Sequence, residues 1–209
     1  MKLIVLGAPG AGKGTQADFI SKRLNIPQIS TGNLLRAEVK RDSALGRRVK
    51  EIIEAGQLVP EAIVTALIRE RLDHPDCAGG YILDGFPRNI AQAQALATFA
   101  DIDAVLVITV PDEVVIARLS GRRVCPRCGA AFHITDNPPK MAGVCDGCAG
   151  TLEVRADDRE DVIRDRFVVY HEQTAPLIAH YGALGLVRTV RGQDRVEDTT
   201  RLTMQALGI

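Results

Sequence analysis

The sequence predicts an α/β protein built on a doubly wound parallel sheet. Short apolar segments recur at residues 3–6, 81–83, 104–110 and 184–190. They are continuous rather than alternating, which is typical of parallel strands covered on both faces. Helical patterns fill the intervals between them, and this alternation favours an open sheet with helices on both sides.

The first expected strand, residues 3–6, runs directly into a glycine-rich loop. From Gly7 to Lys13 the spacing is Gly-x-x-x-x-Gly-Lys, and a helix-forming segment follows. Glycines let the backbone approach an anion, and inward N–H groups and the helix N-terminus attract it. Lys13 would reach the terminal phosphates, and Thr15 offers a hydroxyl nearby. We predict a nucleotide phosphate site, although Gly14 stands where Ser or Thr commonly follows the lysine. The alternative is a glycine-rich turn without ligand.

The later elements follow in the same rhythm. A helix is expected to begin at Pro60-Glu61, with apolar residues recurring every four positions behind it. The other expected elements are a very short strand at residues 28–29 and helices at residues 112–119 and 198–207. Two segments depart from the alternation of strands and helices. Residues 31–59 are helical and charged and contain no expected strand. Residues 121–158 have too few large apolar side chains to form a core alone.

Length and charge limit the possible functions. The 209 residues suffice for one compact domain with small insertions. Lys+Arg and Asp+Glu both total 26, so no global field attracts nucleic acid or a membrane, and an anion site must be built from local clusters. No apolar run approaches the roughly 18 residues that span a bilayer, and the first run ends too early for a secretory signal. We therefore expect a soluble, cytoplasmic protein.

Four of the five cysteines form two pairs, Cys125-x-x-Cys128 and Cys145-x-x-Cys148. This spacing predicts one tetrahedral structural zinc site. Two disulfides are the alternative, which a cytosolic chain has little need of, and iron could occupy the same four thiolates. A metal would supply the stability that this core-poor segment lacks. Cys77 is expected to be an ordinary small apolar residue.

A second group of polar residues follows the expected strand at residues 81–83. In open α/β sheets, ligands bind beyond the carboxyl ends of the strands. Asp84 there could hold Mg²⁺ through its water shell, or it could serve as a turn carboxylate. Gly85 would permit close backbone approach, and Arg88 offers a planar fork to a phosphate.

Arginines gather near the two insertions. They are Arg36 in the first, Arg122 and Arg123 at the start of the second, Arg155 at its end, and Arg166 beyond it. A zinc-stabilised flap that closes over a triphosphate would bring guanidinium groups to the charge that develops in phosphoryl transfer. Each arginine alone could be a solvated surface charge.

Five separate segments resemble one known family. They are residues 7–15 (GAPGAGKGT), 29–33 (ISTGN), 83–88 (LDGFPR), 121–124 (GRRV) and 170–177 (YHEQTAPL). With the cysteine pattern they resemble bacterial adenylate kinase, in the long form whose lid carries zinc. The resemblance runs from Met1 to the C-terminal helix. It implies direct in-line transfer of a phosphoryl group from ATP to AMP in a closed site, giving two ADP, with Mg²⁺ on the ATP, by a monomer.

The same resemblance implies a P-loop NTPase-type doubly wound parallel sheet with a small helical NMP-binding insertion and a zinc-ribbon-like lid insertion. The core is expected to comprise residues 1–29, 60–120 and 159–209. The NMP-binding insertion is expected at residues 30–59 and the zinc-binding lid at residues 121–158.

The resemblance also implies the site residues. ATP is expected to contact Gly10, Ala11, Gly12, Lys13, Gly14, Thr15, Arg122, Ala131, Phe132 and Asp194. AMP is expected to contact Thr31, Arg36, Gln57, Leu58, Val59, Gly85, Phe86, Pro87, Arg88, Gln92, Arg155 and Arg166. Catalysis is expected to depend on Lys13, Asp84, Arg88, Arg122, Arg155 and Arg166.

Several roles stay open at this point. Phe132 could lie against adenine or in the core of the lid, and His133 is expected to be structural because four thiolates complete a tetrahedron. Asp157 and Asp158 could organise charge around Mg²⁺ or set the lid hinge. Asn33 stands where the family often has Asp.

Two other functions compete with this interpretation. One is a kinase for UMP, CMP or GMP on the same scaffold. The Gln92 amide suits an adenine edge, but Gln92 could instead be a solvated helix residue, so the base preference stays open. The other is a zinc-ribbon protein that binds nucleic acid or a partner and uses the nucleotide as a switch. That function would require a basic, aromatic face, and Phe132 is the one aromatic residue in 121–158.

Overall fold

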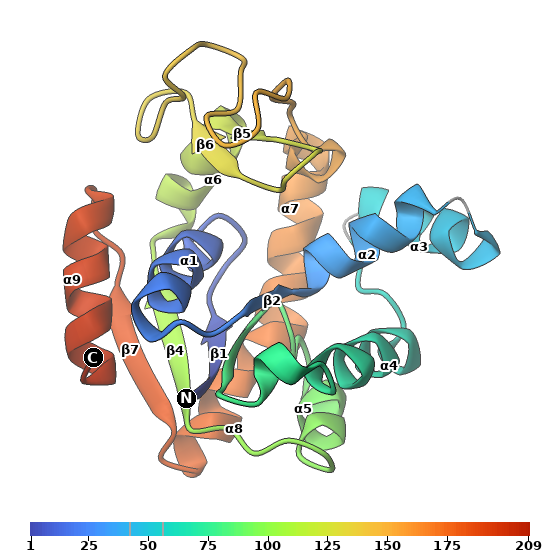
Figure 1. Ribbon diagram of the computed structural model, residues 1–209, viewed down its shortest axis with the longest axis vertical. Coiled ribbons are helices and arrows are strands. Elements are labelled where there is room, and N and C mark those ends of the chain that lie inside the picture. Colours follow the sequence, from blue (N-terminus) through green and yellow to red (C-terminus); the bar gives the residue numbers. More distant parts are fainter. Residues whose placement is uncertain (42, 56) are drawn as a thin grey trace.

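A five-stranded parallel sheet forms the centre of the protein, in a computed structural model that describes residues 1–41, 43–55 and 57–209 (Figure 1). Asp42 and Gly56, both within the predicted NMP insertion, lie outside the described residues. The strand order is β2-β3-β1-β4-β7, and all four pairings are parallel. The strands are β1 (Lys2–Leu6), β2 (Gln28–Ser30), β3 (Tyr81–Asp84), β4 (Ala104–Thr109) and β7 (Val187–Arg191). The predicted doubly wound α/β fold is confirmed.

The central strand β1 shows why the apolar segments are continuous. Ile4 and Leu6 pack into the cluster on one face of the sheet, while Leu3 and Val5 pack into the cluster on the other. None of these four side chains is more than 3% exposed. Because successive side chains of a strand point to opposite faces, burial of both faces requires every position to be apolar.

Helices cover both faces of the sheet (Figure 1). One face is covered by α1 (Lys13–Leu24) and α9 (Val196–Leu207). The other is covered mainly by α4 (Glu61–Leu72), α5 (Ile90–Leu96) and α8 (Pro176–Ala183). The predicted helix start at Glu61 is confirmed. No helix in the described part of the chain has the length and apolar character needed to cross a membrane.

The expected strand at residues 184–190 is wrong at its beginning. Leu184 is the C-cap that follows α8, and the N–H of Leu186 bonds to the Tyr181 carbonyl at 3.2 Å, so the chain turns before β7 starts at Val187. Leu184 is 60% exposed. β7 also lies at the edge of the sheet, where Arg188 and Thr189 are exposed, so it lacks the two-sided burial of the central strands.

Two segments project from this core (Figure 1). The first contains α2 (Thr31–Lys40) and α3 (Ala44–Glu54), in keeping with the helical prediction. The second lies above the carboxyl end of the sheet and contains a two-stranded antiparallel sheet, β5 (Arg122–Val124) and β6 (Ala131–His133). α6 (Asp112–Gly121) leads into this segment, and a 3₁₀ turn (Ala156–Asp158) followed by α7 (Glu160–Val169) leads out of it. Below, "NMP insertion" denotes residues 30–59 and "lid" residues 121–158.

Candidate active site

The glycine loop wraps around the amine of Lys13. Lys13 is the first residue of α1, and its Nζ donates to the carbonyls of Gly7 and Ala8, both at 2.8 Å. Burial lowers the pKa of this amine to about 7; nearby Asp84 opposes the shift, and neighbouring arginines add to it. The loop therefore contains a partly desolvated cation beside backbone N–H groups and a helix N-terminus, an arrangement that suits a phosphate.

Asp84 lies directly opposite this loop, at the end of β3. Gln28 donates from Nε2 to its Oδ2 at 3.2 Å, which fixes the carboxylate. A side chain at Gly14 would place its Cβ 3.4 Å from the same oxygen. The absence of a side chain at this position leaves space beside Asp84. A carboxylate with such space fits Mg²⁺, which keeps most of its waters and takes one or two carboxylates.

The loop after β3 carries Arg88 and is packed tightly. Gly85 has φ +83°, and a Cβ there would lie 2.8 Å from Thr31 Oγ1, so the backbone conformation and the contact both require glycine. Thr31 Oγ1 donates to the Gly85 carbonyl at 2.8 Å, and Arg88 Nε donates to the same oxygen at 2.8 Å. The approach of the Gly85 backbone to a ligand stays a prediction.

Gln92 is nearly fully buried in α5. Its Oε1 accepts the Arg88 backbone N–H at 2.7 Å, and it is 2% exposed. It is therefore not a solvated helix residue. One lone pair of the carbonyl oxygen is engaged with Arg88, and the reading of an adenine edge by this amide stays a prediction.

The predicted cations converge on one region. Burial lowers the pKa of Arg36 and of Arg88, and it lowers the pKa of Arg155 to about 9. Like charges add to each shift: Arg166 acts on Arg88, and Arg122 acts on Arg36 and Arg155. The Nε of Arg155 is buried without a hydrogen-bond partner in the described structure. Crowded, desolvated guanidinium groups with an unsatisfied donor fit a polyanionic ligand.

Two carboxylates hold this cluster together at the base of the lid. The side chain of Asp158 is fully buried; it accepts a bidentate pair of hydrogen bonds from Arg122 and a third at 3.0 Å from Arg166. Arg166 also pairs with Asp157 at 3.1 Å. Burial alone would raise the pKa of Asp157, but Arg166 and Arg155 outweigh it and hold the pKa below its usual value. In this structure both carboxylates therefore bind arginines at the hinge.

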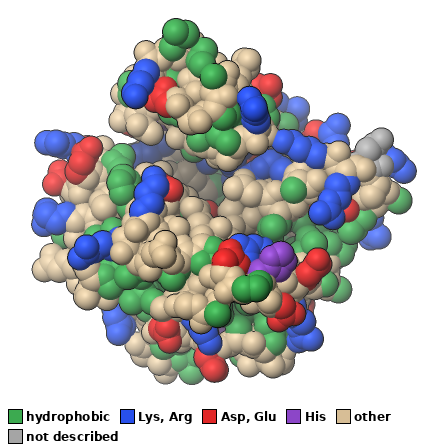
Figure 2. All heavy atoms as spheres, in the orientation of Figure 1, with side chains coloured by type: hydrophobic (Ala, Val, Ile, Leu, Met, Phe, Trp, Pro, Cys, Tyr) green, Lys and Arg blue, Asp and Glu red, His purple; other side chains and the backbone are tan. Residues whose placement is uncertain are grey.

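The site lies in a recess between the sheet and the lid. Figure 2 shows the molecule hollowed beneath the lid, with basic side chains along the hollow. A pocket in this recess is lined by Val5, Leu6, Gly7, Pro9, Lys13, Leu58, Gly85, Pro87, Arg88, Arg166, Val169, Tyr170 and Thr174. Three other predicted AMP residues are placed differently: Val59 and Phe86 are buried in the core, so only their backbone can face a ligand, while Gln57 is exposed.

The predicted ATP residues are less closely grouped. Ala11 and Gly12 belong to the glycine loop, and the Thr15 side chain is exposed. Asp194 is exposed in a turn beyond β7 and is not among the residues that line the described recess. In the lid, Ala131 is exposed, and Phe132 packs against the core that contains Cys125, Cys145 and Leu152. That packing favours the structural role for Phe132.

The lid and the NMP insertion touch each other across the recess. Lys40 Nζ, at the end of α2, donates to the Pro126 carbonyl in the lid. A Cβ at Gly129 of the lid would lie 3.4 Å from Asn33 Nδ2, so Asn33 lies next to this glycine, and its Oδ1 accepts a hydrogen bond from Arg36 Nη2 at 2.7 Å. The two insertions are therefore in contact with each other.

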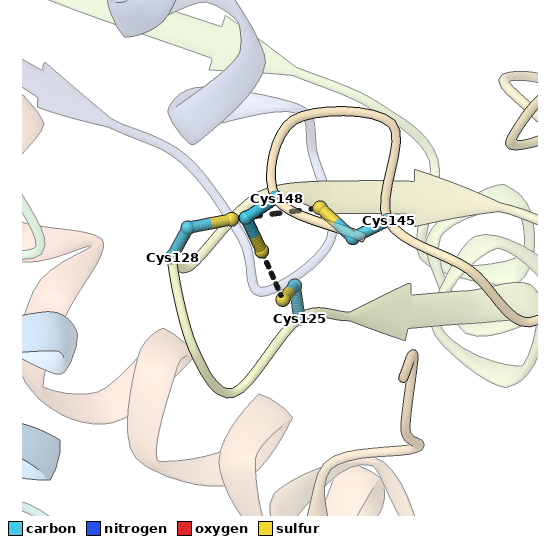
Figure 3. A group of neighbouring side chains, drawn as sticks. All are labelled: Cys125, Cys128, Cys145 and Cys148. Atoms are coloured by element: carbon cyan, nitrogen blue, oxygen red, sulfur yellow. Dashed lines mark hydrogen bonds between the residues drawn. The ribbon is translucent and has the colours of Figure 1, made fainter. Parts of the chain in front are cut away.

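The four paired cysteines form one cluster in the lid (Figure 3). All four sulfur atoms lie within 4.8 Å of one another, with contacts of 3.4 Å for Cys125–Cys148 and 3.5 Å for Cys128–Cys145. Sulfur ligands of a tetrahedral zinc lie about 3.8 Å apart. His133 lies outside the cluster, and its Nδ1 accepts the backbone N–H of Asp136 at 3.0 Å, as expected for a structural residue. The residues fit a structural zinc ion.

The two cysteine pairs use the same backbone turn. In the first, Cys125 N bonds to the Ala130 carbonyl and Gly129 N to the Cys125 carbonyl; the second repeats this six-residue pattern from Cys145 to Gly150. Hydrogen bonds from the backbone N–H groups of Cys128 and Arg127 outweigh desolvation and lower the pKa of the Cys125 thiol to about 6.

The Cys148 thiol behaves in the opposite way. The backbone N–H of Gly150 lowers its pKa, but the sulfur atoms of Cys125 and Cys128 outweigh this and raise the pKa to about 12. Four thiolates cannot coexist at this spacing without a cation, because each raises the energy of the others. A bound divalent metal resolves this conflict.

Two polar side chains at the site were not predicted from the sequence. Gln28 binds Asp84, and the Thr174 hydroxyl donates to the Arg88 carbonyl at 2.7 Å. Gln28 lies in a strand that the sequence only hints at. Thr174 lies within residues 170–177, a segment that carries the family resemblance without an assigned role.

Comparisons with known proteins agree with this geometry. A family model described as "Adenylate kinase" matches residues 5–186. The chain is 51% identical over 214 residues to the adenylate kinase of Caldicellulosiruptor bescii, with all of both chains covered. It is 48% identical to that of Acetivibrio thermocellus (99% of this chain and 98% of the relative) and 46% identical to that of Streptomyces griseus (99% and 97%).

Proposed function

Since the chain belongs to the adenylate kinase family, we propose how its residues divide the work of one reaction. That reaction is the reversible transfer of a phosphoryl group from Mg²⁺-bound ATP to AMP, which yields two ADP. The observation that supports our assignment most is that Lys13, Arg88 and Arg166 line one recess. Arg36 and Arg155 are desolvated as well, and neighbouring arginines of the site lower the pKa of each.

ATP is assigned to the glycine loop and the lid. Lys13 and the loop N–H groups bind its β- and γ-phosphates, and Arg122 approaches them from the lid. Asp84 would hold Mg²⁺ through its water shell, and the bound ion would neutralise part of the charge of the phosphates.

AMP is assigned to the NMP insertion and to the loop after β3. Arg36 and Arg88 bind its phosphate, Thr31 and the backbone of Gln57 to Val59 surround the nucleoside, and Gln92 reads the base. Arg88 lines the recess, and Arg36 is near enough to lower the pKa of Arg88, which supports a phosphate bound by both guanidinium groups.

Transfer is direct and in line between the two nucleotides. Arg155 from the lid and Arg166 from α7 are assigned to the charge that develops on the transferred group. The protein contributes alignment, electrostatic stabilisation and exclusion of water, which would otherwise accept the phosphoryl group. The contact of Lys40 with the lid supports a closed site in which water is excluded.

The same assignment divides the chain into a core (residues 1–29, 60–120 and 159–209), an NMP-binding insertion (30–59) and a zinc-binding lid (121–158). We propose a monomer, as the family resemblance implies. The even balance of acidic and basic residues supports action on free nucleotides in the cytoplasm, without nucleic acid or membrane as partner.

The base preference is tested by mixing Mg·ATP separately with AMP, CMP, UMP and GMP and separating the products by chromatography. We expect rapid ADP formation with AMP, stopping at equilibrium before ATP is exhausted, and slow transfer to the other three. Faster transfer to another monophosphate would keep the fold and reassign the substrate. Absence of transfer to all four would favour a nucleotide switch, which salt-dependent RNA binding would then test.

A further inference from the structure

The loop that carries Arg88 is held by side chains from three separate elements. Thr31 binds the Gly85 carbonyl from the start of α2, and Gln92 accepts the Arg88 N–H from α5. Thr174 donates its hydroxyl to the Arg88 carbonyl at 2.7 Å, from the helix that follows the lid. Both the backbone N–H and the backbone C=O of Arg88 therefore have a side-chain hydrogen-bond partner.

Thr174 reaches Arg88 because the helix widens at this point. Between α7 and α8, residues Tyr170–Thr174 form a π turn, in which the Ala175 N–H bonds to the Tyr170 carbonyl at 2.8 Å. Pro176 follows immediately and has no N–H to continue the ordinary ladder. Such single π turns occur frequently at functional sites. Here it places Tyr170 and Thr174 together on the wall of the recess.

The geometry points to Thr174 as a positioning residue for the Arg88 guanidinium, an inference that rests on the proposed binding of the AMP phosphate by Arg88. A bidentate clamp on a phosphate requires a fixed guanidinium plane. The Arg88 guanidinium is fixed by the hydrogen bond from its Nε to the Gly85 carbonyl. Thr174 fixes the backbone of the same residue through the hydrogen bond to the Arg88 carbonyl. Thr174 acts through Arg88 and has no contact with the reacting atoms in this role.

The same helix also carries Arg166, eight residues earlier. Arg166 binds Asp158, and Asp158 binds Arg122 of the lid. The Thr174–Arg88 hydrogen bond therefore connects Arg88, on the AMP side, to the helix that contains Arg166. Through Asp158, Arg166 is linked to Arg122 on the ATP side. One element sets the spacing of guanidinium groups on the two sides of the transferred phosphoryl group.

The test is Thr174→Val, which keeps the shape of the side chain and removes the donor. Loss of a donor to a partly buried carbonyl is expected to raise KM for AMP about fivefold to tenfold. KM for ATP, measured at saturating AMP, should change less than twofold. Thr174→Ser keeps the hydroxyl and should restore KM for AMP. If the valine variant does not fold, Thr174→Ala removes the same donor and takes its place.

Two controls make the result decisive. Thr200→Val removes a hydroxyl of similar exposure that donates to the Val196 carbonyl at 2.9 Å in α9, and it should leave both KM values unchanged. Arg88→Lys tests the underlying assignment and should raise KM for AMP. An unchanged KM for AMP in Arg88→Lys would overturn the proposed role of Arg88 itself.

If Arg88→Lys raises KM for AMP, three results would overturn the inference about Thr174. They are an unchanged KM for AMP in Thr174→Val, an equal rise in both KM values, or a serine variant that fails to restore binding. Thermal melting accompanies each measurement, because a merely structural threonine would lower Tm without separating the two KM values.

Discussion

Replacing Lys13 with methionine should lower kcat by about two to three orders of magnitude, the usual cost of removing one electrostatic contact to a transition state. The side chain keeps its apolar stem and most of its length. The fold should persist because, within the described part of the chain, the Lys13 amine donates to carbonyls of its own loop. Turnover is measured by coupled assay and folding by thermal melting. The matched control is Lys22→Met in the same helix, where the amine pairs with Asp18 at the surface. Near-normal turnover in Lys13→Met would contradict its assigned role.

The same substitution has a consequence for pH. The pKa of Lys13 is about 7 in the folded protein and 10.5 ordinarily. The unfolded chain therefore binds more protons between pH 7 and pH 10.5, and stability rises with pH across that window. Below pH 7 the folded protein carries a desolvated charge. Lys13→Met removes this penalty, so its Tm should exceed that of the unmodified protein near pH 6, and the difference should shrink as pH rises to 9. A difference that grows with pH would contradict the sign of the shift.

Replacing Cys125 and Cys128 together with serine should remove the metal and loosen the lid. Residues 121–158 have a small apolar cluster, Cys125, Cys145 and Leu152 with a few neighbours, and the metal is expected to supply the remaining stability. A loss of roughly 3 to 5 kcal/mol would lower Tm by roughly 6 to 20 °C in a chain of this size.

Metal content is measured by elemental analysis of the purified protein, alongside Tm. We expect one zinc per chain before the substitution and almost none after it, and the same measurement distinguishes zinc from iron. Cys77→Ala is the matched control, because Cys77 is buried in the core of the sheet and outside the cluster. Unchanged metal content in the double variant would contradict the assignment.

The parts of the fold that were predictable are those encoded by neighbouring residues. A few neighbouring residues specify the apolar run at Leu3 to Leu6, the glycine loop and the Asp84 turn. The C-x-x-C spacing of the cysteine pairs is likewise visible in the local sequence. The start of β7 was not predictable in this way. Leu184 is apolar and resembles a strand residue, yet the turn that ends α8 leaves it exposed.

The parts of the site that were missed depend on contacts between distant segments. Gln28 and Asp84 are 56 residues apart, and Thr174 and Arg88 are 86 apart. No local pattern specifies which of several threonines reaches a particular carbonyl. The two possible roles of Asp158 were likewise indistinguishable until its partners, Arg122 and Arg166, were visible.

The proposed division of labour requires that one site bind two nucleotides and run in both directions. Incubating the protein with Mg²⁺ and ADP alone, and following the nucleotides by chromatography, tests this directly. We expect ATP and AMP to appear in equal amounts until the reaction stops at an equilibrium mixture of all three nucleotides. Release of inorganic phosphate without ATP, or no change in ADP, would contradict direct phosphoryl transfer between two nucleotides.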